Sequence, residues 1–232
     1  MKDIFIKIIW VTALYLVSNF GIAQTKNIRI KFIGNCGLYM TDGTTNIYID
    51  FPYKSGAHKY MEFETSELDS LKQNSIYIFT HKHSDHYSKK SLKTVLKEKG
   101  GQTYGPWNIE ELEKLKNSIS EFEIQAFKTE HKFWGISFKH YSYFINWHGK
   151  RIYLSGDTES AETIGEIKDI DWAFVPYWLL LDAAEKDIKI DADMFYIYHL
   201  ASVQVPSARK KWGTIENVHP LVEQGEVIIL DI

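Results

Sequence analysis

The sequence predicts an α/β fold in which helices cover paired β-sheets. Segments with the alternating or continuous apolar pattern of strands recur along most of the chain, and segments with helical spacing lie among them. Apolar residues make up 44% of the chain and charged residues 25%, a globular balance that excludes a disordered or collagen-like protein. No linker, charge block or internal repeat divides residues 27–232. We therefore expect one domain over residues 24–232.

Local signals place the expected helices and strands. Ser88 can cap a helix that runs through Lys99 and stops at Gly100. Asn108 opens a second helix that ends near Ile119. Strands and turns follow from apolar alternation and from turn dipeptides. The expected strands are Ile28–Ile33, Asn46–Ile49, Ser75–Phe79, Phe122–Phe127, Ile136–Trp147, Arg151–Ser155, Trp172–Val175, Met194–Tyr198 and Val227–Leu230, with turns at Asp42-Gly43 and His148-Gly149.

Residues 1–23 have the pattern of a secretory signal peptide. Lys2 and Lys7 give a basic start, Ile8–Val17 is almost wholly apolar, and the small residues Gly21 and Ala23 suit cleavage after Ala23. The apolar run is shorter than the roughly 20 residues of a membrane-spanning helix. We therefore expect an exported protein, periplasmic or secreted, without a stable membrane anchor. An uncleaved anchor or a buried N-terminal helix is the alternative.

The charged residues and the single cysteine restrict the function classes. A net charge of −3 leaves no basic excess that would attract nucleic acid, so we expect no nucleic-acid partner. Cys36 is the only cysteine of the chain. This excludes an intramolecular disulfide framework and a cysteine-rich zinc site. The chain also contains 9 histidines, and imidazole is the commonest metal ligand in proteins.

The strongest functional signal is the segment His81-Lys82-His83-Ser84-Asp85-His86, which directly follows an expected buried strand. In an extended segment, His81 and His83 would point the same way. Asp85 and His86 would have to turn toward a second point nearby. Neutral imidazoles with a carboxylate suit Zn²⁺, Fe²⁺ or Mn²⁺. The alternative, a polar loop that happens to be rich in histidine, would place protonatable groups beside a buried strand at a cost in free energy.

The pattern His-x-His-x-Asp-His after a strand resembles the signature of the metallo-β-lactamase superfamily. Three further segments are similar to that family. Ile33–Gly37 resembles its early glycine turn, and Ile47–Phe51 resembles a strand that ends in Asp. Ile152–Thr158 resembles the strand that leads to Gly-Asp-Thr. The resemblance covers most of residues 27–232 and implies a four-layer αββα sandwich with metals at one edge of the paired sheets.

The resemblance also implies the metal ligands. One metal would be held by two histidines of the motif and a third histidine, for which His131 is favoured over His140. A second metal would be held by Asp85, His86 and a last histidine, for which His199 is favoured over His219. Asp157 would bridge both metals. The implied ligand set is His81, His83, Asp85, His86, His131, Asp157 and His199. Otherwise His140 would be a solvent-facing strand residue, His148 a turn residue and His58 a surface residue.

This ligand set resembles the lactonase, phosphodiesterase and glyoxalase-type branches, because Asp157 stands where the common β-lactamases of the superfamily carry a metal-binding cysteine and Cys36 lies far upstream. The implied function is a hydrolase with two divalent ions, zinc first and manganese or iron as alternatives. A metal-bridging hydroxide would attack an ester, lactone or phosphoester. Asp85 and Asp157 are the candidate catalytic residues. A proton shuttle through Asp85 is disfavoured by its coupling to the metals.

The substrate is expected to be a small molecule that is anionic or partly apolar. Two divalent ions outweigh the negative groups of the site, which favours an anion. Phe133-Trp134 and Tyr177–Leu181 could form an apolar wall near the metals, or equally could serve helix packing or a dimer contact. Lys54, Lys82 and Lys132 could meet a substrate anion, although scattered lysines are more often solvated.

Three other functions compete with hydrolysis at this stage. An iron-dependent sulfur dioxygenase of the same superfamily would use one iron and part of the ligand set. A nuclease of the superfamily would share the motif, but the acidic charge and the expected export argue against it. A metal-binding protein without hydrolytic activity would not need the complete ligand set.

Overall fold

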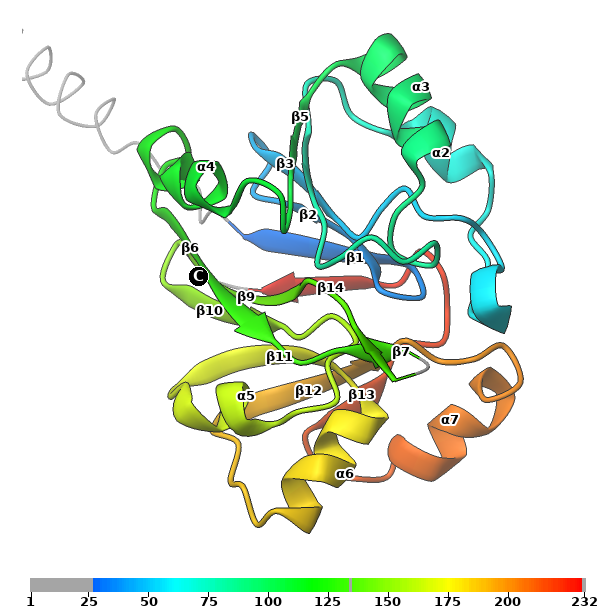
Figure 1. Ribbon diagram of the computed structural model, residues 1–232, viewed down its shortest axis with the longest axis vertical. Helices are drawn as coiled ribbons and strands as arrows, with labels where there is room; N and C mark the ends of the chain where they lie inside the picture. The colour runs from blue at the N-terminus through cyan, green and yellow to red at the C-terminus, as the bar shows by residue number, and fades with distance from the viewer. Residues whose placement is uncertain (1–26, 134, 231–232) are drawn as a thin grey trace, which may run out of the picture.

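The computed structural model describes residues 27–133 and 135–230. Two six-stranded sheets face each other, and helices cover the outer face of each sheet (Figure 1). The expected α/β sandwich with four layers is therefore confirmed. The expected signal peptide and Trp134 lie outside the described residues. Within the described part of the chain, no helix is long and apolar enough to cross a membrane.

The first sheet combines an antiparallel half with a parallel half. Strands β14, β1, β2 and β3 pair antiparallel, while β3, β4 and β5 run parallel. The last strand of the chain thus lies beside the first. The strand order is β14 (Val227–Leu230), β1 (Ile28–Gly34), β2 (Gly37–Thr41), β3 (Asn46–Ile49), β4 (Ile76–Ile78) and β5 (Gln102–Tyr104), with η1 (Ala57–Lys59), α2 (Ser66–Ser70) and α3 (Lys89–Lys99) in the connections.

The second sheet is parallel from β10 to β13, and β9 pairs antiparallel with β10 and β6. Helices α5, α6 and α7 cover its outer face (Figure 1). Its strand order is β13 (Val218–Pro220), β12 (Ala192–Tyr198), β11 (Ile170–Pro176), β10 (Lys150–Leu154), β9 (His140–Trp147) and β6 (Phe122–Thr129). The remaining elements are α4 (Ile109–Glu113), η2 (Lys114–Asn117), the hairpin β7 (Lys132–Phe133) and β8 (Ile136–Ser137), α5 (Glu162–Glu166), α6 (Tyr177–Glu185) and α7 (Val205–Trp212).

The main core lies between the two sheets. Strand β1 contributes Ile30 and Phe32, and the facing sheet contributes Ile145, Trp147 and Leu154, all of them buried. Each such large side chain contributes about 1.5–3 kcal/mol when it leaves water. Smaller apolar clusters fill the space between each sheet and its covering helices. The interior of the sandwich is therefore mainly apolar, and polar side chains gather where the strands end.

Local signals placed most elements correctly. Helix α3 begins after the N-cap Ser88 and ends at Gly100, as expected. The second expected helix is shorter, because α4 passes into the 3-10 helix η2. The strand expected at Ile136–Trp147 is interrupted between β8 and β9. Tyr177–Leu181, the candidate apolar wall, begins helix α6, where Leu179 and Leu180 pack on the second sheet.

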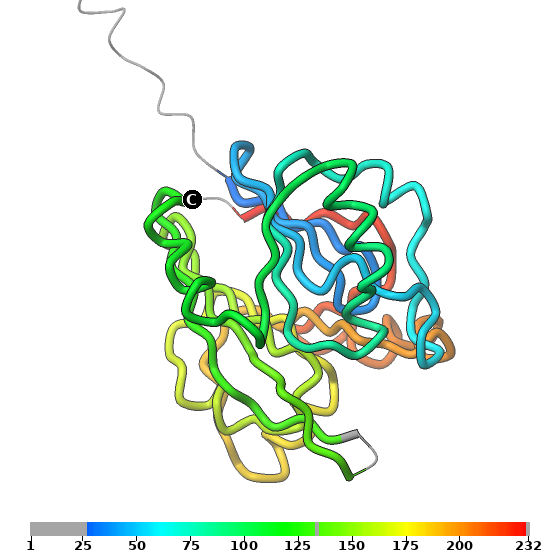
Figure 2. Tube along the Cα trace, turned by 45° about the horizontal axis from the view of Figure 1, so that its top comes forward, coloured from blue at the N-terminus to red at the C-terminus, as the bar shows by residue number. Residues whose placement is uncertain are grey.

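Loops from both sheets meet at one edge of the sandwich. The segments after β4, β6, β10 and β12 carry the motif residues. The loop before residue 61 also reaches this edge, where Tyr60 forms an isolated antiparallel bridge with Ala201. Figure 2 shows these two segments side by side although 141 residues separate them. 

A cluster of polar contacts around the buried His148 joins the sheets at the other ends of the strands. His148, in the turn between β9 and β10, lies 3.0 Å from Asp42 Oδ2 and 2.6 Å from Glu121 Oε2. Asp42 also accepts the backbone N–H groups of Thr44 and Thr45. Burial opposes ionisation of Asp42, but these hydrogen bonds hold its pKa well below the ordinary value.

We predict that Asp42→Asn lowers the free energy of unfolding by about 1–3 kcal/mol at pH 7, because a charged hydrogen-bond acceptor is lost. A carboxyl with a depressed pKa stabilises the fold above its unfolded pKa of about 4 and loses that contribution as the pH falls below it. The difference between wild type and variant should therefore shrink from pH 7 toward pH 3 in urea denaturation. Asp169→Asn, at an exposed carboxyl paired with Arg151, should stay within about 0.5 kcal/mol. An Asp42→Asn effect that does not change with pH would contradict the prediction.

Candidate metal centre

The 81–86 segment is shaped by bonds that begin at the end of β4. Thr80 donates its backbone N–H and its hydroxyl to the two oxygens of Asp50, both at 2.7 Å. The backbone N–H of His86 donates to the carbonyl of His83, which closes a tight turn. The segment is thus extended at its start and turned at its end. This is the local geometry that can aim His81 and His83 at one point and Asp85 at another.

The first cluster contains three imidazoles and one carboxylate. Ligand atoms of His81, His83, His131 and Asp157 all lie within 4.8 Å of one another. His83 Nδ1 is 3.0 Å from His131 Nε2. His81 Nε2 lies 3.6 Å from Asp157 Oδ1, and His131 Nε2 lies 3.4 Å from Asp157 Oδ2. Among the described residues, the buried atoms His81 Nε2 and Asp157 Oδ1 have no hydrogen-bond partner.

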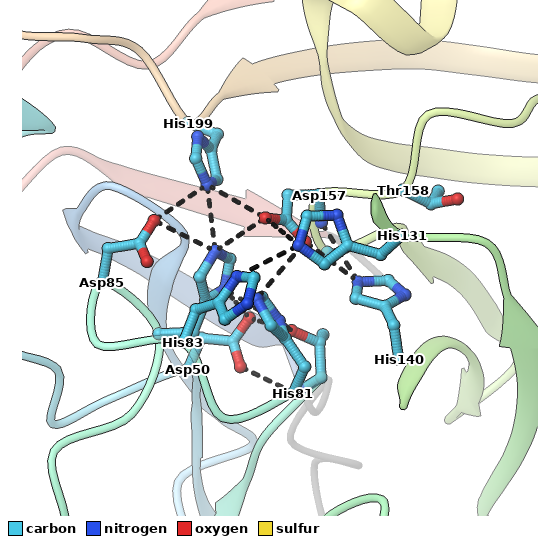
Figure 3. A network of polar contacts seen from close by, with 12 residues as sticks. Asp50, His81, His83, Asp85, His131, His140, Asp157, Thr158 and His199 are labelled. Carbon is cyan, nitrogen blue, oxygen red and sulfur yellow. Dashed lines mark hydrogen bonds and ion pairs between the residues drawn. The ribbon is translucent and has the colours of Figure 1, made fainter. Parts of the chain in front are cut away.

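The second cluster lies on the other side of Asp157 (Figure 3). His86 Nε2 is 2.9 Å from His199 Nε2, and Asp85 Oδ2 is 3.3 Å from the same atom of His199. Asp157 Oδ2 lies 3.7 Å from His86 Nε2 and 3.8 Å from His199 Nε2. The structure therefore brings together the seven side chains of the expected ligand set, with Asp157 between the two groups.

Buried residues behind the ligands hold them in place. Asp50 Oδ2 accepts a hydrogen bond from His86 Nδ1 at 2.8 Å. His140 Nε2 accepts the backbone N–H of Asp157, so His140 Nδ1 carries the proton and donates to Thr129 Oγ1 at 2.7 Å. His140 was expected to face solvent, but it is fully buried beneath Asp157. The alternation of a strand shows which residues share a face, and it did not show that this face is covered.

The electrostatic environment favours ionised carboxylates and neutral imidazoles at His81 and His83, but a protonated imidazole at His86. Burial lowers the pKa of His83 to about 4 and holds that of His81 well below its ordinary value. Burial opposes ionisation of Asp85, but His86 and His199 lower its pKa to about 2. Burial lowers the pKa of His86 too, but Asp50, Asp85 and Asp157 outweigh it and raise that pKa to about 9. A cation at the second cluster would replace the proton on His86 Nε2.

The residues present fit a pair of divalent cations. The first cluster offers three imidazole nitrogens and a carboxylate oxygen, and the second offers two imidazole nitrogens with carboxylate oxygens. Such donor sets suit Zn²⁺, Fe²⁺ and Mn²⁺. The buried and unpartnered atoms of His81 and Asp157 would otherwise cost about 1–3 kcal/mol each. Two cations sharing Asp157 would satisfy both atoms.

An open cavity of about 680 Å³ lies above the clusters. Tyr60 and Trp178 border it and pack edge-on against the His199 ring, with ring centroids 4.0 Å and 5.1 Å away. Trp178 is held by a hydrogen bond from Nε1 to the carbonyl of Thr158 at 3.1 Å. The cavity is lined by His58, Lys59, Tyr60, His83, Asp85, His131, Lys132, Asp157, Glu159, Trp178, Leu181, Asp182 and Glu185.

Three other residues considered in the sequence analysis are placed by the structure as follows. His58 is exposed at the surface, as expected, but it also borders the cavity, with Nε2 3.1 Å from Ser84 Oγ. His219 belongs to the short strand β13 and pairs with Glu226, away from the site. Tyr177 stacks on Trp212, in agreement with the packing alternative.

The lysines differ in their surroundings. Lys132 borders the cavity and pairs with Glu130. Lys82 lies over the Trp107 ring, with its nitrogen 4.8 Å from the ring centroid, and Lys54 is exposed.

Cys36 lies at the site, but the sequence analysis did not predict it because it is far from the other site residues along the chain. Its sulfur lies within 4.8 Å of ligand nitrogens of His86 and His199, although 50 and 163 positions separate them. No sequence motif indicates that the turn after β1 lies beside the end of β12. Asp50 and Glu159 were also missed as site residues, although a strand ending in Asp was recognised at Asp50.

A family model described as a beta-lactamase superfamily domain matches residues 29–178. The chain belongs to this superfamily. The expected resemblance is thereby confirmed, and the match contains the 81–86 motif, His131 and Asp157 but not His199. A comparison with curated proteins found no match.

Solved structures show the same fold at low sequence identity. Igni18, a metallo hydrolase from the archaeon Ignicoccus hospitalis, is similar with a TM-score of 0.66 and 16% identity over 89% of this chain and 99% of that one. An isothiocyanate hydrolase from Delia radicum gut bacteria gives 0.62 and 12%, over 88% and 100%. The metallo-beta-lactamase fold protein YhfI from Bacillus subtilis gives 0.57 and 14%, over 88% and 99%.

We predict that Gly156→Ala disrupts the centre. A Cβ at Gly156, where φ is +63°, would lie 2.4 Å from His140 Nε2 and push the support away from Asp157. We expect zinc affinity to fall at least tenfold, the scale of losing an outer-shell contact, in a chelator-competition titration. Gly149→Ala is the matched control, because Gly149 also has a positive φ of +78° but its Cβ would meet no described atom within 4 Å. An equal loss of zinc affinity in both variants would contradict this prediction, because backbone strain alone would then explain the effect.

We also predict that Asp50→Asn weakens the second cation by about 10- to 100-fold and the first cation less, because Asp50 bonds His86 directly but reaches His81 only through the Thr80 hydroxyl. Stepwise zinc titration measures both affinities. Asp171→Asn serves as the control, since Asp171 accepts the backbone N–H of Arg151 on a strand away from the cavity. Equal weakening of both cations by Asp50→Asn would contradict the assignment.

Proposed function

We propose that this member of the superfamily is a metal-dependent hydrolase of small molecules. It would hold two divalent cations, zinc first, and cleave an ester, lactone or phosphoester bond. The observation that carries the proposal is the position of Asp157 between two clusters of nitrogen and oxygen donors at the base of an open cavity. The hydrolases among the similar structures are evidence for the fold alone, and their activities are compatible with this proposal.

The chain's residues divide into ligands, supports and cavity walls. Bound at the two clusters, divalent cations would lower the pKa of water and polarise a carbonyl or phosphoryl oxygen. Asp157 would serve as a ligand common to the two groups. Asp85 would serve as a ligand that stays ionised, in keeping with its pKa of about 2. That low pKa argues against Asp85 as the proton donor to a leaving group at neutral pH.

The cavity wall favours an uncharged and partly apolar substrate. Tyr60 and Trp178 form one aromatic side, and Leu181, which is 61% exposed, extends it along α6. The same rim carries three carboxylates against two lysines. The carboxylates are Glu159, Asp182 and Glu185, and the lysines are Lys59 and Lys132. We therefore infer that an ester or lactone with an apolar acyl or aromatic part suits the cavity better than a phosphodiester.

The direct test combines metal content with a hydrolysis screen. Purified protein should bind two zinc or manganese ions per chain by elemental analysis and should hydrolyse at least one lactone, ester, thioester, β-lactam or phosphodiester substrate. Asp157→Ala and His83→Ala should each lower kcat/KM by about a thousandfold or more, because a central electrostatic contact is lost. His219→Ala removes a histidine outside the cavity and should keep full activity.

The competing functions predict different results in the same experiments. One iron per chain with oxygen consumption would favour the sulfur dioxygenase function. A salt-sensitive affinity for RNA would favour a nuclease. Full hydrolytic activity in Asp157→Ala or His83→Ala would end the assignment of this centre as the active site.

A further inference from the structure

Cys36 lies in the turn between β1 and β2, directly beside the second cluster. Its side chain is fully buried, and its sulfur is within 4.8 Å of ligand nitrogens of His86 and His199. The turn is bonded to both segments that carry this cluster. The carbonyl of Asn35 accepts the backbone N–H of His199 at 3.1 Å, and the Asn35 side-chain amide donates to the carbonyl of Asp85 at 2.8 Å. The only thiol of the chain is therefore held in a defined position relative to the second cluster.

The imidazoles of this cluster are arranged as ligands. His86 Nδ1 donates to Asp50, so the lone pair of a neutral His86 is on Nε2. That nitrogen lies 2.9 Å from His199 Nε2. His199 is 1% exposed, and its Nδ1 has no hydrogen-bond partner among the described residues. Two buried imidazole nitrogens at this distance, with Asp85 Oδ2 only 3.3 Å from one of them, form a donor set that a cation would fill.

The two clusters differ in the donors they offer. The first has three imidazoles with Asp157, whereas the second has two imidazoles with Asp85 and a share of Asp157. Cys36 lies where a third strong donor of the second cluster would be. It is absent from the cavity lining, which includes Asp85 and Asp157. A sulfur ligand would thus come from the protein interior and leave the cavity side open to substrate.

We propose that Cys36 is a ligand of the second cation, together with His86, His199 and Asp85. On coordination the thiol releases its proton to solvent and its sulfur forms one bond to the cation. This proposal rests on the metal centre proposed above. It assigns the second position to thiolate-binding cations such as zinc, iron and cobalt, in preference to magnesium or calcium, because soft sulfur ligands select the former.

Without cations, the surroundings of Cys36 favour the neutral thiol over the thiolate. Burial raises the pKa of the Cys36 thiol, and the carboxylates of Asp50, Asp157 and Asp85 raise it further. Two divalent cations would offset those carboxylates, and a coordinating thiol is deprotonated outright. The added thiolate would cancel positive charge at the centre. This agrees with a preference for uncharged esters over phosphodiesters.

The test is the absorption spectrum of the cobalt-substituted protein, measured without thiol reductants. Wild type should show a sulfur-to-cobalt charge-transfer band in the near ultraviolet together with the visible d–d bands. Cys36→Ser and Cys36→Ala should lose the charge-transfer band and keep the d–d bands. The chain has a single cysteine, so the thiolate band has one source. Zinc X-ray absorption of wild type should likewise show a sulfur shell at about 2.3 Å, absent in Cys36→Ser.

The outcomes separate this proposal from the proposed function. Wild-type protein that binds two cobalt ions but shows neither the charge-transfer band nor the sulfur shell would overturn the role of Cys36 and leave the metal centre intact. Wild-type protein that binds no cobalt or zinc would overturn both. The wild-type spectra decide the question even where a variant fails to fold, which circular dichroism would reveal.

Discussion

The position of one carboxylate determines the rest of this site. Asp157 lies three residues after the central strand β10, within 3.4–3.8 Å of nitrogens of His81, His86, His131 and His199. Its backbone N–H donates to the buried His140, and Gly156 before it has a positive φ. A shift of this carboxylate would separate the two ligand groups. The buried network beneath it therefore serves the chemistry of the cavity above.

The same edge also joins the two halves of the sandwich. Asp85 and His86 follow β4 of the first sheet, whereas His199 ends β12 of the second. Cation binding would therefore stabilise the contact between the sheets, since a site assembled from both halves exists only in the folded chain. At the opposite ends of the strands, His148 and Asp42 form a second polar contact between the halves. The apolar core lies between these two contacts.

The walls of the cavity come from segments without metal-binding signals. Tyr60 follows η1 in the connection between β3 and β4 of the first sheet, and Trp178 is in the first turn of helix α6 on the second sheet. Both rings touch His199, so the aromatic wall and a metal ligand share one packing arrangement. A substrate on this wall would lie beside the second cluster, where Cys36 approaches from below. Substrate preference and cation preference are thus set by neighbouring residues.

The sequence alone determined the family, the sandwich and the ligand-bearing segments. These follow from local order: His81 through His86 form one short motif after a strand, and Asp157 lies in Gly-Asp-Thr after another. The tertiary structure decided which distant side chains join them. His131 and His199 were chosen by their positions after strands, but Cys36, His58 and His140 could not be placed that way. Their proximity depends on the pairing and packing of strands far apart in the chain, and strand alternation tells which residues share a face but not what covers it.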